Sequence, residues 1–112
     1  MKDDTIAEKL PKKAKVKAGG DGVVVEYVLQ LFIAGLSPNS VRAITNIREI
    51  CERYLKGRYD LKIIDIYREP SYAIKEEIIA MPLLIKRLPL PEARLIGDLS
   101  DTEKVLKGLD II

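Results

Sequence analysis

Apolar residues are grouped along the chain in a way that predicts a buried strand followed by an amphipathic helix. Over Val23–Ala34 an almost continuous apolar run is interrupted only by Glu26 and Gln30. Such a run is typical of a central strand that is covered on both faces. Over residues 41–54 the apolar positions recur at intervals of three and four, which predicts a helix of about four turns with one buried face.

The residues on either side of this helix carry the signals of its two ends. Ser37 is suited to the N-cap and Pro38 to the first helical position, while Gly57 follows the last turn. Apolar and polar residues alternate over Tyr59–Tyr67, which predicts a second strand. Because a helix connects the two strands, we expect them to be parallel neighbours in one sheet.

The second half of the chain predicts a short helix, two short strands and a last helix. The short helix begins at Pro70, runs to about Ile79 and is followed by Met81-Pro82. The strands are expected at Leu83–Leu88 and Arg94–Ile96, and Ser100 with Glu103 forms a capping box for the last helix. The predicted order, β-α-β-α-β-β-α, is an α/β fold of the thioredoxin-like kind.

A thioredoxin enzyme carries a Cys-x-x-Cys pair between its first strand and first helix, and this chain has serines there. Ser37 and Ser40 occupy the two positions, and a serine cannot pass through a disulfide. The single cysteine, Cys51, lies on the predicted buried face of the helix, as free cysteines commonly do. Pro82 falls where such folds carry a cis-proline. The pattern therefore argues against thiol redox chemistry.

Charge is unevenly divided between an N-terminal arm and the rest of the chain. The 112 residues contain 19 Lys and Arg against 17 Asp and Glu. The whole excess lies in residues 1–22, where apolar residues are few, so we predict a disordered, Lys-rich arm before one domain at residues 23–112. A neutral domain argues against a basic nucleic-acid-binding body, although the arm leaves binding to an acidic surface open.

Composition excludes several further classes of protein. No apolar run is long enough to span a bilayer, and the N-terminus has no apolar stretch typical of a secretory signal. One cysteine cannot form a disulfide framework, which indicates a reducing, cytoplasmic compartment. Without histidine, a zinc site of the usual kind and histidine acid–base chemistry are out of reach. These absences make most enzyme classes improbable, and we expect no cofactor or metal.

Several strings of the sequence resemble the KaiB family of circadian-clock proteins. The most specific are Pro38-Asn39-Ser40-Val41-Arg42-Ala43 and Ile96-Gly97-Asp98-Leu99-Ser100. Further matches include Tyr27-Val28-Leu29, Phe32-Ile33-Ala34-Gly35, Leu88-Pro89 and Gly108-Leu109-Asp110. The likeness extends over about residues 26–111.

The resemblance implies a regulatory protein that is not an enzyme and that changes its fold. KaiB-like proteins rest as oligomers in the order β-α-β-β-α-α-β, so we expect a homodimer or homotetramer and, in a crystal of the oligomer, that resting order. They switch to a thioredoxin-like monomer that binds the ATPase KaiC. That form captures KaiA and competes with a thioredoxin-like sensor domain of a histidine kinase.

The resemblance also implies which residues act. Arg42, Lys62 and Arg94 match family positions as exposed cations and are the expected partner-binding residues. Gly108 and Asp110 belong to the motif that balances the two folds. Pro82 is a further expected control point, because isomerisation of an X–Pro bond takes tens to hundreds of seconds.

Local sequence is compatible with two folds of the second half. Residues 74–79 are rich in β-branched side chains, which favour a strand. Gly108 costs a helix about 1 kcal/mol relative to alanine, so Gly108→Ala is expected to favour the thioredoxin-like order. Gly108 is equally suited to a simple helix C-cap.

The sequence departs from clock-type members at Glu26, at Leu90, in its Lys-rich arm and in ending at Ile112. These differences favour a divergent or non-cyanobacterial homologue, paired with a KaiC-like ATPase in a system without KaiA. Three alternatives stay open at this point. They are a sensor or adaptor domain for a histidine kinase, a degenerate thiol oxidoreductase using Cys51, and an adaptor that binds through the arm.

Overall fold

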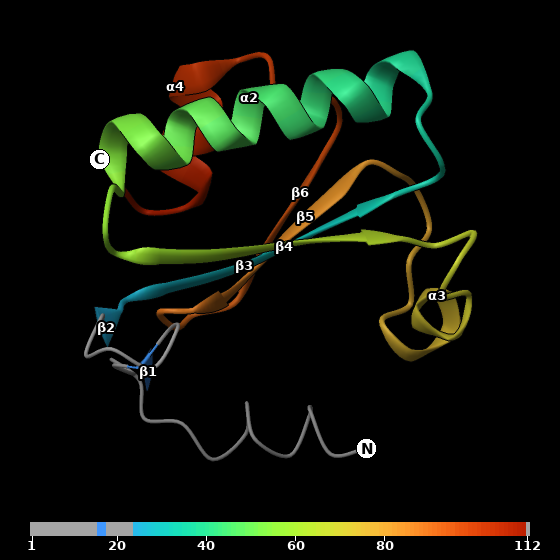
Figure 1. Ribbon diagram of the computed structural model, residues 1–112, viewed down its shortest axis with the longest axis horizontal. Coiled ribbons are helices and arrows are strands. Elements are labelled where there is room, and N and C mark those ends of the chain that lie inside the picture. The colour runs from blue at the N-terminus through green and yellow to red at the C-terminus, as the bar shows by residue number, and fades with distance from the viewer. Residues whose placement is uncertain (1–15, 18–23, 112) are drawn as a thin grey trace.

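The computed structural model describes residues 16–17 and 24–111 (Figure 1). Its elements are, in chain order, β1 (Val16–Lys17), β2 (Val24–Val25), β3 (Tyr27–Ile33), α2 (Pro38–Tyr54), β4 (Tyr59–Asp65), α3 (Ser71–Lys75), β5 (Leu83–Leu88), β6 (Ala93–Ile96) and α4 (Thr102–Gly108). From β3 onward this is the predicted order β-α-β-α-β-β-α, and not the resting order that we expected in an oligomer.

The main sheet has four strands in the order β4-β3-β5-β6. Strands β3 and β4 are parallel, with Tyr27 opposite Tyr59 and Ile33 opposite Asp65. Strand β5 is antiparallel to β3, and β6 is antiparallel to β5. The long apolar run therefore forms a central strand, as predicted, and β4 and β6 are the two edges of the sheet.

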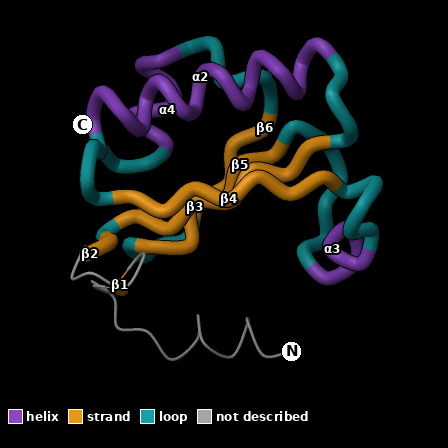
Figure 2. Tube along the Cα trace, viewed as in Figure 1, coloured by secondary structure: helices purple, strands orange, loops and turns teal. Residues whose placement is uncertain are grey.

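Helices cover the two faces of the sheet unequally (Figures 1 and 2). Helices α2 and α4 both lie on one face, and the short α3 lies on the other face near one end. The larger core lies between the sheet and α2 with α4; it includes Leu29, Leu31, Ile47, Cys51, Leu55, Leu84, Val105 and Leu109. The smaller core lies beneath α3; its buried residues are Phe32, Ile64, Ile66, Leu83 and Ile85.

Helix α2 begins as the sequence predicts. The Ser37 side chain accepts a hydrogen bond from the backbone N–H of Ser40, and Pro38 is the first helical residue. The chain leaves the helix through Gly57, whose φ of +78° suits glycine. Two positions of the expected apolar face are wrong, because Val41 is 46 % exposed and Tyr54 is 36 % exposed; the buried apolar residues begin at Ala43.

The two later helices differ from the prediction at their ends. Helix α3 is shorter than expected, because the chain turns at Glu77, where φ is +54°, and does not continue to Ile79. Helix α4 is capped by Asp101, which accepts from the Lys104 N–H, and not by Ser100. The N–H of Ser100 instead donates to the Asp98 carboxylate, so the helix begins one residue later.

Most of the predicted arm lies outside the described residues. Within it, Val16–Lys17 pairs antiparallel with Val24–Val25 in a small two-stranded sheet. Across the described ranges, no helix has both the length and the apolar character to cross a membrane.

Candidate functional site

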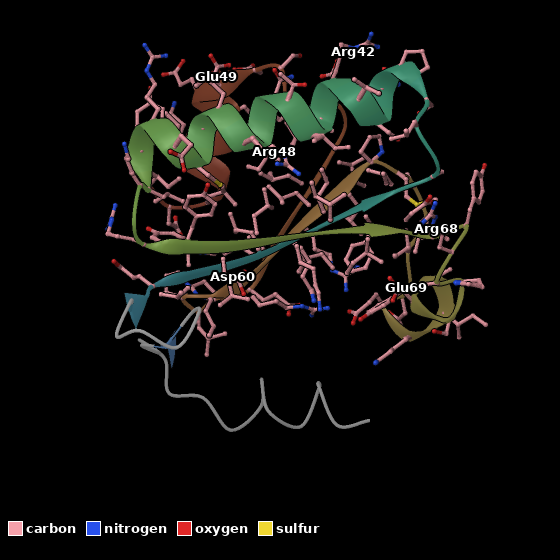
Figure 3. The ribbon with its side chains drawn as sticks, viewed as in Figure 1. Arg42, Arg48, Glu49, Asp60, Arg68 and Glu69 are labelled. Atoms are coloured by element: carbon pink, nitrogen blue, oxygen red, sulfur yellow. The ribbon has the colours of Figure 1, made fainter. Side chains whose placement is uncertain are left out.

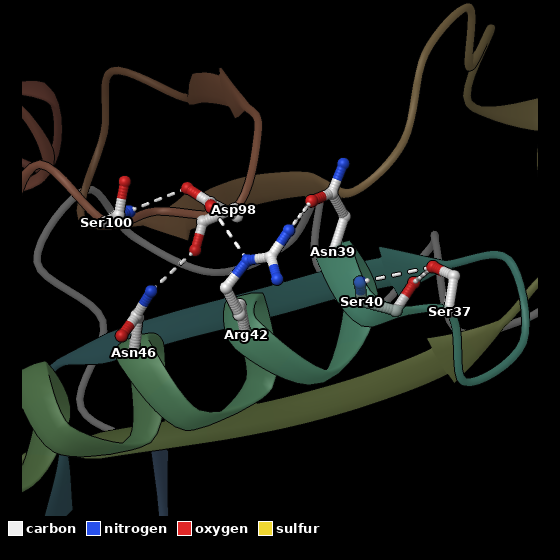
Figure 4. A network of polar contacts seen from close by, with 7 residues as sticks. All are labelled: Ser37, Asn39, Ser40, Arg42, Asn46, Asp98 and Ser100. Atoms are coloured by element: carbon white, nitrogen blue, oxygen red, sulfur yellow. Dashed lines mark hydrogen bonds and ion pairs between the residues drawn. The ribbon is translucent and has the colours of Figure 1, made fainter.

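Two serine hydroxyls meet where a thioredoxin would carry its thiols. Ser37 Oγ donates to Ser40 Oγ over 3.0 Å at the start of α2 (Figure 4). Ser37 is exposed and Ser40 is buried. The Met81–Pro82 bond is cis, as the fold analogy predicted, and Pro82 is buried just before β5. The frame of a thioredoxin site is present, but its two reactive sulfurs are replaced by hydroxyls.

The only thiol of the sequence lies buried in the larger core. Cys51 is fully buried on α2, as the sequence predicted. Burial, with a smaller contribution from the charge of Glu52, raises the pKa of this thiol to about 12. Because the thiolate is the reactive form, Cys51 is inert at neutral pH.

Arg42 joins the start of α2 to the loop that follows β6. Its Nε lies 3.1 Å from Asp98 Oδ2, and its Nη2 donates to Asn39 Oδ1 (Figure 4). One helical turn further on, Asn46 Nδ2 donates to the Asp98 carbonyl oxygen over 2.8 Å. The side chain of Arg42 is held by these contacts and is still 54 % exposed.

The Asp98 carboxylate accepts hydrogen bonds from Ser100 in its own loop and from Arg42 on α2. Its Oδ1 accepts the backbone N–H of Ser100 over 3.1 Å. Hydrogen bonds from Ser100, and after them the one from Arg42, lower the pKa of the Asp98 carboxyl. Beside it lies a hollow of about 410 Å³, lined by residues 94–101 with Lys104 and Val105. The two most specific strings of the sequence thus form one continuous surface.

The structure does not bring the three expected partner-binding cations together. Lys62 is exposed on β4 and Arg94 lies on β6, at opposite edges of the sheet. Arg94 is 39 % exposed, and its Nη1 donates to the carbonyl oxygen of Glu76 over 2.8 Å. Arg42 is the one of the three that pairs with Asp98, whereas Arg94 lines the edge of the adjacent hollow and is held by Glu76.

The end of α4 contains the two expected fold-switch residues. Gly108 is the last helical residue and Leu109 is the cap, so Gly108 is not the C-cap. Asp110 has φ +60°, and its N–H donates to the carbonyl oxygen of Lys107. The N–H of Ile111 donates to the Leu106 carbonyl oxygen. Together these bonds form a Schellman motif, with aspartate where glycine is usual.

The sequence did not predict the burial of two charged residues, Lys86 and Glu76. Lys86 is fully buried on β5, with its Nζ 3.3 Å from Asp110 Oδ2. The Glu76 side chain is 10 % exposed and pairs with Arg87. The only sequence signal for Lys86 is a lysine inside the apolar run of β5, and Glu76 carries none.

The fold and the site define a thioredoxin-like protein built without the thiol pair, whose polar surface joins the start of α2 to the loop after β6. The KaiB domain model matches residues 30–111. The chain therefore belongs to the KaiB family.

Relatives from cyanobacteria agree over most of the domain. A circadian clock oscillator protein KaiB of Prochlorococcus marinus is 52 % identical over 86 residues, which cover 77 % of this chain and 82 % of the relative. The protein of the same name from Synechococcus elongatus is 51 % identical over 86 residues, covering 77 % and 84 %. This chain is thus similar to circadian clock proteins through its domain.

Solved structures show the same fold at low identity. Mitochondrial thioredoxin 3 of Saccharomyces cerevisiae aligns with a TM-score of 0.62 and 16 % identity, covering 79 % of this chain and 80 % of that one. The N-terminal domain of Synechococcus elongatus SasA aligns with a TM-score of 0.62 and 20 % identity, covering 85 % and 93 %. These similarities establish the thioredoxin-like fold.

Proposed function

We propose that this chain is a non-enzymatic regulatory protein that binds a KaiC-like ATPase in a circadian or related timing system. The thioredoxin-like order is the form that binds the ATPase. Binding takes place in the cytoplasm and needs no cofactor. The proposal rests on membership of the KaiB family together with the polar surface at the start of α2.

The observation that carries the proposal is the ion pair between Arg42 and Asp98. It ties the string at residues 38–43 to the string at residues 96–100, although the two are far apart in sequence. Arg42 is held at one side of its guanidinium and keeps more than half of its surface free. A cation fixed in this way can pair with an acidic group of a partner at little further cost in side-chain entropy.

Lys62 provides a second contact on a different part of the surface. It lies on β4, whose outer edge has no neighbouring strand in the main sheet. Such an edge can be extended by a strand of another protein. We propose that Lys62 and this edge belong to the same ATPase-binding surface as Arg42; where KaiA or a histidine kinase sensor domain is present, it is a further candidate partner.

Fold switching is the remaining part of the proposal. In the resting state the second half adopts the order β-α-β-β-α-α-β within a homodimer or homotetramer. Pro82, Gly108 and Asp110 lie in the half of the chain that is rebuilt, and Gly108 with Asp110 forms the end of α4. A change in the stability of α4 therefore changes the balance between the two orders.

A thiol oxidoreductase is disfavoured on chemical grounds. The buried Cys51 has a pKa raised to about 12, and serines stand at both positions of the expected thiol pair. Neither residue type supplies a thiolate at neutral pH.

Co-elution with the ATPase tests the proposal. We expect the full chain to co-elute with the KaiC-like ATPase of its own organism in size-exclusion chromatography, in a manner that depends on the bound nucleotide. Arg42→Glu should abolish the complex. Arg48→Glu is the matched control, because Arg48 is an exposed arginine of the same helix (Figure 3). Absence of co-elution under every nucleotide condition overturns the proposal.

A further inference from the structure

The side-chain carboxylate of Glu76, directly after α3, is almost completely buried. Its Oε1 lies 2.6 Å from Arg87 Nη2 on β5 and 3.7 Å from Arg94 Nη2 on β6. Arg94 Nη1 also donates to the backbone carbonyl oxygen of Glu76 over 2.8 Å. Two arginines on neighbouring strands therefore hold both the side chain and the backbone of one residue.

Arg87 is itself fixed by Gln30 in the sheet and by Glu92 in the turn before β6. Its Nε donates to Gln30 Oε1 on β3 over 2.8 Å, and its Nη1 lies 2.7 Å from Glu92 Oε2. Desolvation lowers the pKa of Arg87, but the hydrogen bonds to Glu76 and Glu92 outweigh it and raise the pKa above the usual value. Arg87 is thus a permanently charged, rigid anchor for the Glu76 carboxylate.

The remaining contacts of the α3 segment with the sheet are apolar and only partly buried. Helix α3 has only five residues, none of them buried. Tyr72 lies beside Phe32, with ring centroids 5.4 Å apart, and Ala73, Ile78 and Met81 also pack, partly buried, against the smaller core. Ile74 and Ile79 point into solvent, with 85 % and 96 % of their surface exposed. The segment is therefore a thin cover over the smaller core, in contrast to α2 over the larger one.

We infer that Glu76, clamped by Arg87 and Arg94, is the latch of a local opening unit formed by residues 67–81. Release of the carboxylate lets this segment leave the sheet and uncovers the smaller core, while the α2 and α4 side stays folded. Breaking such a pair leaves an uncompensated, largely desolvated charge, so the closed state depends on all three side chains. In this assignment Arg94 is a positioning residue of the latch.

Hydrogen exchange on the full chain tests the latch. The amides of Glu76 and Ile78 report on it: they donate to Tyr72 and Ala73, and a five-residue helix loses such bonds once it leaves the sheet. With rates corrected for intrinsic exchange, Glu76→Gln should speed exchange of both amides roughly tenfold. Glu77→Gln is the matched control, since Glu77 is the exposed neighbour on the same turn, and it should leave both rates unchanged.

A second variant keeps the test decisive if Glu76→Gln fails to fold. Arg94→Gln should speed exchange of the same two amides by a smaller factor, because Arg87 still pairs with Glu76. The amides of Leu31 and Ile47, in the larger core, should keep their rates in every variant. Equal rates in the Glu76→Gln and Glu77→Gln proteins overturn the inference. An increase of the same size at Leu31 and Ile47 overturns it as well, since the opening is then global.

Discussion

Arg42 Nε and Asp98 Oδ2 lie 3.1 Å apart, although 56 positions separate the two residues in the chain. The contact joins the first turn of α2 to the loop between β6 and α4. It is therefore present only while β6 and α4 have the places that the thioredoxin-like order gives them. A partner that recognises Arg42 in this setting recognises the fold as well as the charge.

The Arg42–Asp98 pair predicts a graded loss of partner binding. Arg42→Glu removes the cation and should abolish co-elution with the ATPase. Asp98→Asn keeps the shape of the loop but releases Arg42, so it should weaken binding by a smaller factor. Both changes should leave urea unfolding almost unaltered, because exposed ion pairs add little stability. Binding that survives Arg42→Glu would remove this residue from the interface.

Gly108 predicts a shift in the balance of the two orders. Alanine gains about 1 kcal/mol over glycine in a helix. A methyl group at this position would lie 2.6 Å from Leu95 Cδ2, the end of a half-buried side chain on an edge strand. Because these terminal methyls can turn toward solvent, the helix gain should prevail and Gly108→Ala should populate the thioredoxin-like order more. NMR populations of the two orders measure the shift.

The contact with Leu95 supplies the control for this prediction. Leu95→Ala removes the crowding that a methyl group at position 108 would meet. Its effect on the populations should therefore be smaller in the Gly108→Ala chain than in the parent chain. Unchanged populations and unchanged ATPase binding in Gly108→Ala would contradict the prediction.

Cys51 predicts a loss of stability at high pH. Its thiol has a pKa of about 12 in the folded chain against 9.0 when unperturbed, so the folded state retains the proton longer. Between these values the unfolded state binds fewer protons, and stability therefore falls as the pH rises above about 9. Cys51→Ala should show a smaller fall in urea midpoint between pH 8 and 11. The same fall in both proteins would show that other groups cause it.

The pair between Lys86 and Asp110 predicts opposite effects of two substitutions. Asp110→Asn tolerates the positive φ but leaves the buried Lys86 ammonium without its carboxylate. Because Asp110 is 65 % exposed and water reaches the pair, the expected loss is about 1–2 kcal/mol in urea unfolding. Lys86→Met should be neutral or stabilising, since it removes the buried charge altogether. A large loss in Lys86→Met would contradict this account.

The Lys-rich arm predicts a result that separates the regulator from an arm-dependent adaptor. Removal of residues 1–15 leaves β1 and the whole domain in place. The shortened chain should co-elute with the ATPase as the full chain does, and with the same dependence on salt. Loss of the partner on shortening would assign recognition to the arm. Contacts of its lysines with phosphates or other acidic groups would then make binding strongly salt-dependent.

The sequence by itself determined the elements whose signals are local. The apolar run at β3, the three- and four-residue spacing along α2 and the Ser37 cap all depend on neighbours in the chain, and the structure confirms each of them. The parallel pairing of β3 and β4 followed from the helical connection between them. The serines at the thiol positions, and the strings that mark the family, are likewise properties of the sequence.

Tertiary structure alone decided the features that depend on distant partners. The sequence predicted Ser100 as the cap of α4, but in the structure Asp101 caps the helix and the N–H of Ser100 donates to Asp98. The burial of Lys86 and Glu76 requires Asp110 and Arg87, which lie on other elements. A charged residue has the same local signature whether it is solvated or paired in the interior. Only the three-dimensional position of its counterion determines which of the two it is.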